Sequence, residues 1–269
     1  MAVNLLPEKI SPANARAGPA SFPYQACAFH VLSRIYPALL YGINMHPIDR
    51  PRFALFFIAL TSFFTLLLWL FLPAEVLIYH TEEGRIVEQL TLYAYGLAIF
   101  LLLVLPVPTF KPLTRYAVIV VLLTMMAREA DLHKAVADMS MIKLRFWTGN
   151  LPLHDKLIAF GFLAPAALAC LWLLFKQGRA TLRAVKQRIP HAISIVSFIA
   201  LIALTNLLDR SLGIVKEWLG WHAPHWLVAL QTSQEEFLEL ALPVLAVIAL
   251  LQYRRSVMYA QKACLLPQP

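Results

Sequence analysis

The sequence lacks the short motifs by which many enzymes can be assigned to a class. It has no glycine-rich phosphate loop, no serine nucleophile elbow, and neither of the zinc motifs His-x-x-x-His and His-Glu-x-x-His. Cysteine is scarce, and the three residues present, Cys27, Cys170 and Cys264, lie too far apart for a redox or metal motif. A disulfide framework and a thiol-based site are therefore not expected.

Charged residues are scarce as well. Of the 269 residues, 14% are charged and 60% are hydrophobic, and the mean hydropathy is +0.67. A soluble domain of this length carries more charge, so the composition predicts an all-α, polytopic integral membrane protein. Residues 1–20 contain no apolar stretch like that of a cleavable signal peptide, and we expect the first membrane helix to direct insertion.

Six apolar stretches predict a domain of six transmembrane helices between residues 53 and 253. Their ranges are 53–72, 90–107, 116 into the charged stretch 128–134, 157–175, 193–208 and 234–253. The first range is the clearest, because its twenty residues contain nothing more polar than serine and threonine. Twenty residues are the length that a helix needs to cross the hydrocarbon layer.

Two further helices are predicted to lie in the membrane interface. Residues 24–44 are mostly apolar but are interrupted by His30 and Arg34, which favours an amphipathic interfacial helix within a cytoplasmic tail, residues 1–52. A seventh membrane segment is the alternative for 24–44. Residues 211–233 contain three tryptophans, Trp218, Trp221 and Trp226, which suit the headgroup level. Residues 254–269 are predicted to form a cytoplasmic C-terminal tail.

The net charge of +8 is explained better by membrane orientation than by nucleic-acid binding. With six crossings, the side that carries the termini has 15 Lys and Arg residues against 8 on the other side, whereas acidic residues number 2 against 13. Basic residues accumulate on the cytoplasmic side of membrane proteins. We therefore predict a multi-pass protein of a bacterial cytoplasmic (inner) membrane, with both termini cytoplasmic and no nucleic-acid partner.

The third stretch carries charges where a membrane helix should be apolar. Tyr116 to Ala127 covers only about half of the roughly 20 residues that a crossing needs, so the helix is predicted to continue through residues 128–134. Glu129 would then lie about 20 Å from the surface at Tyr116. Ionisable groups at this depth are costly and mark functional sites by default.

Carboxylates on other helices reach a similar depth. Counted from the cytoplasmic end of each helix, Glu239 lies about 21 Å deep, Glu235 and Asp209 about 27 Å, and Glu88 about 28 Å. Four helices are thus predicted to deliver acids to one layer in the outer half of the membrane, where Pro243 also leaves the carbonyl oxygen of Glu239 without its usual N–H donor.

These side chains predict a metal or proton site. On a continued helix Glu129 and His133 share a face, and Glu235, Glu236 and Glu239 lie along one side of theirs. The predicted ligands of a Zn, Fe or Mn ion are Glu129, His133, Glu235 and Glu239; the predicted catalytic groups are Glu129, Asp131, His133 and Glu236; the supporting residues are Glu88, Arg128 and Asp209. The usual Glu-x-x-His spacing is absent, and the same acids could hold protons instead.

Lys143 and Arg145 form a second candidate site on the outer surface. With Phe146 and Trp147 beside them, they could bind a lipid phosphate. The alternative is that they are bases whose charged ends reach the headgroups beside an aromatic belt.

Three functions are consistent with these patterns. The first is a membrane-embedded, metal-dependent enzyme, a hydrolase or an oxidoreductase, acting on a lipid or another membrane-soluble substrate at the outer (periplasmic) leaflet. The second is a proton- or cation-coupled transporter that uses the same acids as a relay. The third is a non-catalytic assembly subunit in which Arg128, Arg210 and Lys134 pair with the acids and fix helix packing. The predicted partners are the bilayer and a membrane-soluble substrate, and no oligomeric state is predicted.

Overall fold

The computed structural model describes residues 46–81, 84–107, 110–132, 140–141 and 143–265, and all regular structure in these ranges is helical. The short 3₁₀ helix η1 (Pro47–Asp49) precedes eight α-helices. They are α2 (Phe53–Phe71), α3 (Ala74–Thr81), α4 (Ile86–Val104), α5 (Pro112–Glu129), α6 (Leu144–Thr148), α7 (Leu153–Lys186), α8 (Pro190–Leu219) and α9 (His225–Leu265). The all-α prediction is confirmed for the described part of the chain.

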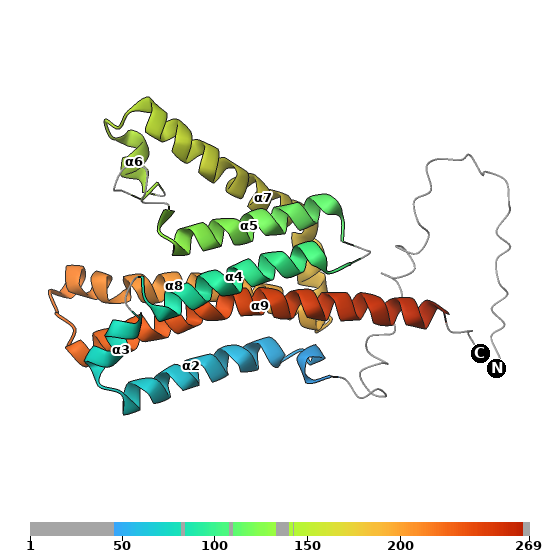
Figure 1. Ribbon diagram of the computed structural model, residues 1–269, viewed down its shortest axis with the longest axis horizontal. Helices are drawn as coiled ribbons and strands as arrows, with labels where there is room; N and C mark the ends of the chain where they lie inside the picture. Colours follow the sequence, from blue (N-terminus) through green and yellow to red (C-terminus); the bar gives the residue numbers. More distant parts are fainter. Residues whose placement is uncertain (1–45, 82–83, 108–109, 133–139, 142, 266–269) are drawn as a thin grey trace, which may run out of the picture.

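Five of the described stretches are long and apolar enough to cross a membrane. They are α2, the α3–α4 stretch Ala74–Val104, α7, α8 and the α9 range His225–Gln261. Helix α5 is not among them, because its 18 residues include Arg115, Arg128 and Glu129. It nevertheless lies beside α4 and runs in the opposite direction to it (Figure 1). A multi-pass membrane protein is the class that this architecture supports.

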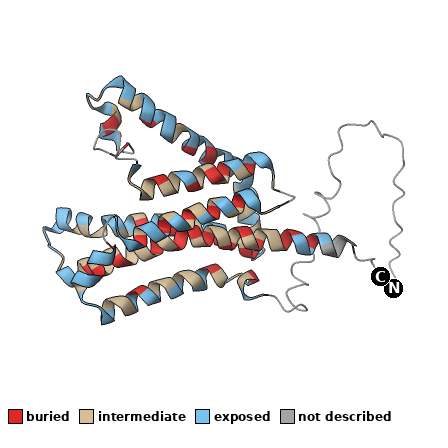
Figure 2. Ribbon diagram, viewed as in Figure 1, coloured by how far each residue is buried: buried red, intermediate tan, exposed pale blue. Residues whose placement is uncertain are grey.

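Helix α9 is the centre of the bundle. It contacts α8, α4, α2 and α3, whereas α5 packs against α4 and α7 (Figure 1). Buried residues are concentrated along α9 (Figure 2), with Leu238, Leu242 and Leu245 in the main apolar core. A helix that is covered by neighbours on several sides needs no polar face, because it has no face toward water.

Side-chain size decides which faces are inside. Ala54, Ala98 and Ala241 are buried in the core, whereas Phe56 and Phe100 are more than half exposed on the outside of the bundle. Lipid tails are as apolar as leucine, so burial of large side chains brings little advantage in a membrane, while small residues let helices approach closely. The exposed apolar surface is thus the expected surface toward lipid.

The C-terminal half of α9 is fastened to the chain that leads into α2. Gln252 donates from Nε2 to the carbonyl oxygen of Ile48 at 2.7 Å, and its Oε1 accepts from the hydroxyl of Ser194 at 2.7 Å. Arg255 Nη1 lies 3.2 Å from Oδ2 of the buried Asp49. These contacts bring η1, α8 and α9 together at one end of the bundle.

The helix at the charged stretch differs from its prediction. It begins at Pro112, four residues earlier than expected, and it ends at Glu129 instead of continuing through residue 134. Proline is well suited to the first turn of a helix, since its fixed φ is already helical and its missing N–H needs no partner there. At the other end Ala130 closes the helix, and Asp131 has a left-handed φ of 52°.

Two other boundaries also differ. The predicted interfacial helix at 211–233 is not a separate element: α8 continues to Leu219, and α9 begins at His225 after a break at Gly220, whose φ is 63°. Helix α7 continues to Lys186, well past residue 175, where the fourth predicted membrane helix ends. The predicted helix at 24–44 lies outside the described residues.

Candidate functional site

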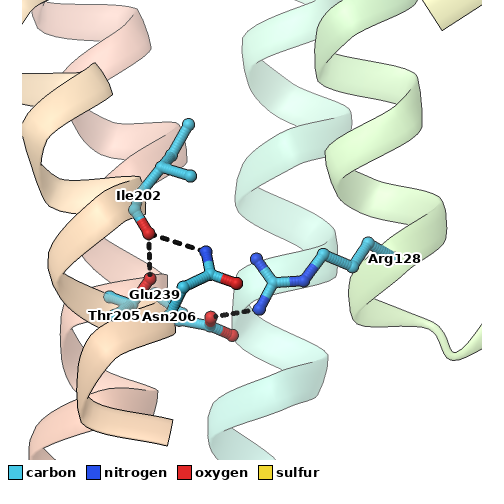
Figure 3. A network of polar contacts seen from close by, with 5 residues as sticks. All are labelled: Arg128, Ile202, Thr205, Asn206 and Glu239. Atoms are coloured by element: carbon cyan, nitrogen blue, oxygen red, sulfur yellow. Dashed lines mark hydrogen bonds and ion pairs between the residues drawn. The ribbon is translucent and has the colours of Figure 1, made fainter. Parts of the chain in front are cut away.

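The strongest site in the structure is a polar cluster that joins three helices. Arg128 at the end of α5 places Nη2 3.0 Å from Oε1 of Glu239 on α9 (Figure 3). The Glu239 side chain is only 9% exposed and that of Arg128 is 27% exposed. A carboxylate buried to this degree needs a cationic or proton-donating partner, because removal from water destabilises the charged form.

This ion pair connects two helices that are separated by a third. Helix α4 packs against both α5 and α9, and the Arg128 side chain extends across it toward Glu239 (Figure 3). The Asn206 side chain of α8 also points toward Arg128, from the side opposite α5 (Figure 3). Its Nδ2 donates to the carbonyl oxygen of Ile202 at 2.7 Å. The guanidinium group therefore faces the carboxylate of Glu239 and the amide of Asn206.

A second carboxyl group joins the first. Glu129, next to Arg128, lies close enough to Glu239 and Glu236 to interact electrostatically with both carboxyl groups. Two carboxyl groups can hydrogen-bond directly to each other only when one of them carries a proton, since two carboxylates have acceptors and no donor. A proton shared between Glu129 and Glu239 would relieve the repulsion between two acids that lie beside one arginine.

Tyr95 completes the cluster from α4. It is 1% exposed and lies within electrostatic range of Arg128, Glu129 and Glu239. Because side chains point toward the N-terminus of their helix, Tyr95 extends toward the N-terminal end of α4. Sequence reasoning missed it, although a phenol between apolar residues in the middle of a predicted span was a usable signal.

The backbone of α9 contributes at the same level. Pro243 is fully buried inside the helix and has no N–H to donate to the carbonyl oxygen of Glu239, four residues earlier. This was predicted from the sequence, and the structure confirms that the helix continues through Pro243.

The structure brings some of the predicted site residues together and separates others. Arg128, Glu129, Glu236 and Glu239 converge as described above. Glu88 instead accepts a hydrogen bond from the backbone N–H of Gly84 at the start of α4. Asp209 is exposed on α8. Those two supporting residues are therefore not part of this cluster.

The prediction for the stretch after Glu129 needs correction. The argument that Glu129 and His133 share a helical face required a helix through residue 133, but α5 ends at Glu129 and Asp131 follows in a left-handed conformation. His133 itself lies outside the described residues, as does Lys134. Glu235, like Glu236, is on α9 and is partly buried.

A metal centre is not visible in the described part of the chain. No group of three or more His, Cys, Asp or Glu side chains there has the spacing that could hold a metal ion. Arg128 also occupies one oxygen of Glu239, one of the predicted ligands. The metal prediction stays a prediction, since His133 is not described.

Lys143 and Arg145 lie at the start of the short helix α6. Both side chains are exposed, while Phe146, which follows Arg145, is completely buried. Trp147 donates from Nε1 to the carbonyl oxygen of Met141 at 2.9 Å. The two bases are thus held at the surface by a buried aromatic residue, which is compatible with binding to a lipid phosphate.

Comparisons with known proteins return no relative: no family model, no curated protein and no solved structure matches the chain significantly.

Proposed function

We propose that this protein is a proton-coupled membrane transporter in which the Glu129–Glu239 pair binds and releases the coupling proton. One observation supports the proposal above all: Glu239 already has Arg128 as its cationic partner at 3.0 Å, and a second carboxyl group, that of Glu129, lies within electrostatic range of both. One base therefore faces two acids. The second acid can be accommodated by a proton, which is small enough to need no coordination shell.

The proposal includes six crossings with both termini in the cytoplasm. Helix α2 begins and α9 ends at the same end of the bundle (Figure 1), which supports an even number of crossings. Helix α5 returns the chain from the end where α4 finishes to the end where α6 lies, and its 18 residues give a length of about 27 Å. The excess of basic residues places the α2 and α9 ends inside.

Partial exposure of Arg128 supports exchange of the proton. The Arg128 side chain is 27% exposed and is therefore accessible from outside the bundle, whereas the Glu239 side chain is only 9% exposed. Protonation of Glu129 and its later release would change how many charges Arg128 must balance. This would change the attraction between α5 and α9 across α4, which is a direct way to couple proton binding to helix movement.

Infrared difference spectroscopy in H₂O and D₂O tests the shared proton directly. A protonated carboxyl group has a carbonyl stretch that a carboxylate lacks. We expect this band in the wild type and its loss in Glu129→Gln; in Glu239→Gln it should also disappear, because Glu129 then pairs with Arg128 as a carboxylate. The exposed Glu217→Gln is the matched control and should keep the band. A wild-type protein without it would refute the proposal.

Transport itself is tested in proteoliposomes that contain a pH-sensitive dye. Candidate membrane-soluble and amphipathic substrates are added outside, and a substrate-dependent pH change inside is expected for the wild type. Glu129→Gln should abolish this pH change while leaving substrate binding measurable. Substrate movement that is unaffected by Glu129→Gln would show that the carboxyl pair does not carry the coupling proton.

The metal-dependent lipid enzyme is the second candidate. It is favoured by the presence of three carboxyl groups, those of Glu129, Glu236 and Glu239, within electrostatic range near one end of the bundle. A metal there would have to replace Arg128 as the partner of Glu239. The two candidates differ in a simple measurement: elemental analysis after gentle detergent extraction finds stoichiometric metal only for the enzyme.

A further inference from the structure

An apolar groove lies between α2 and α8, and none of its lining residues belongs to the polar cluster. Its volume is about 310 Å³. Helix α2 contributes Leu55 and Ile58, and α8 contributes Val196, Ala200 and Leu204 at four-residue spacing, which places them on one helical face. The only polar side chain in the lining is that of Ser197, so the groove suits an apolar ligand.

The length of the groove matches one leaflet of a bilayer. Its lining on α8 extends from Ile193 to Leu204, which corresponds to about 16 Å along the helix axis. The hydrocarbon core is ~30 Å thick, and each leaflet accounts for half of it. The groove begins three residues after α8 starts at Pro190, so it occupies the leaflet next to that end of the bundle.

Basic side chains are gathered at the same end. Val185, which lines the groove, is followed by Lys186 and Arg188, and Arg52 comes one helical turn before Leu55. All three bases are exposed. No Asp or Glu occurs between residues 156 and 209, and Asp49, the acid that precedes Arg52, is buried against Arg255.

We infer that an anionic phospholipid occupies this site, with one acyl chain in the groove and its phosphate among Arg52, Lys186 and Arg188. Basic pockets between membrane helices on the cytoplasmic side are suited to anionic headgroups. A second copy of the chain is a poorer occupant, because a symmetric dimer would bring the same basic surfaces face to face. The charge at the groove end thus selects a lipid rather than this protein itself.

Native mass spectrometry of the delipidated protein tests this site. The probes are dioleoyl phosphatidylglycerol and dioleoyl phosphatidylcholine, which share acyl chains and differ in headgroup charge. We expect the wild type to retain phosphatidylglycerol preferentially. Ala200→Trp, which fills the groove, should lose this binding, and the double variant Arg52→Gln/Arg188→Gln should bind phosphatidylglycerol about tenfold more weakly or worse. The controls are Ile199→Trp and Arg179→Gln, exposed positions that do not line the groove.

The opposite results are equally clear. Phosphatidylglycerol retained equally by Ala200→Trp and Ile199→Trp would show non-specific surface lipid and overturn the inference. A wild-type dimer that Ala200→Trp dissociates would identify a second copy as the occupant and would also overturn it. If Ala200→Trp does not elute as a folded species, Leu204→Phe fills the other end of the groove with a smaller change and decides between the same outcomes.

Discussion

Replacement of Arg128, Glu129 and Glu239, three ionisable residues of the cluster, should have unequal effects on stability. Removal of one member of a buried ion pair typically costs ~3–5 kcal/mol, because its partner stays buried without compensation. Arg128 is 27% exposed, which places the expected cost of Arg128→Gln near the lower limit, at about 3 kcal/mol. This variant leaves Glu129 and Glu239 together without a base.

Glu239→Gln should be milder, at about 1 kcal/mol, because Glu129 can take over as the partner of Arg128. Glu129→Gln should be neutral or stabilising, since glutamine resembles a protonated glutamate and can still donate a hydrogen bond to Glu239. In the double variant Arg128→Gln/Glu239→Gln both members of the ion pair are removed, so neither is left buried without its partner. Its cost should fall short of the sum of the single costs by about 2 kcal/mol, within the range for directly coupled residues.

The assay is reversible unfolding in mixed micelles, measured for the wild type, the three single variants and the double variant. Lys216→Gln and Glu217→Gln on the exposed end of α8 are the matched controls, and both should stay within ±0.5 kcal/mol. Additive effects of the Arg128 and Glu239 substitutions would refute the ion pair as a stabilising contact. A loss in Glu129→Gln as large as that in Arg128→Gln would refute the shared proton.

Three further predictions concern topology, metal content and a helix boundary. In a cysteine-free background, Arg183→Cys and Trp221→Cys should react with a membrane-impermeant thiol reagent from opposite sides; labelling from one side would contradict the six-span topology. Elemental analysis of the wild type and of His133→Ala should give the same, sub-stoichiometric metal content; one metal per wild-type chain that His133→Ala removes would favour the enzyme. Gly220→Ala should lower the free energy of unfolding by about 1 kcal/mol, because alanine is strained at φ 63°. Gly213→Ala, inside α8 with open space around it, should instead stabilise by up to ~1 kcal/mol, and equal effects would contradict the left-handed cap.

Apolar periodicity predicted most of the fold, because long apolar stretches in a membrane protein have few alternatives to a helix. The range 53–72 agrees with α2 to within one residue. The third helix was shifted, since the prediction lengthened it toward the charges rather than toward Pro112. The prediction extended the third helix through residues 128–134 to give it a membrane-spanning length. In the structure, α5 reaches 18 residues by starting at Pro112 and ending at Glu129.

The candidate site was predicted in part for a similar reason. Depth along a helix is a one-dimensional quantity, and it correctly placed Glu129 and Glu239 at one level. It does not report which way a side chain points around the helix, so Glu88 and Asp209 were included although they lie elsewhere. The pairing of Arg128 with Glu239 across α4 depends on the tertiary arrangement, which no spacing within one helix reveals.

Pro243 gives α9, a helix of 41 residues, a position at which it can bend. Between Pro243 and Gln261 the helix has a length of about 27 Å, and its Gln252 and Arg255 side chains are tied to the chain before α2. A change of bend of ~20° at the proline would displace the far end by about 9 Å. A change of bend at Pro243, one turn from Glu239, would therefore be transmitted along α9 to the contacts of Gln252 and Arg255.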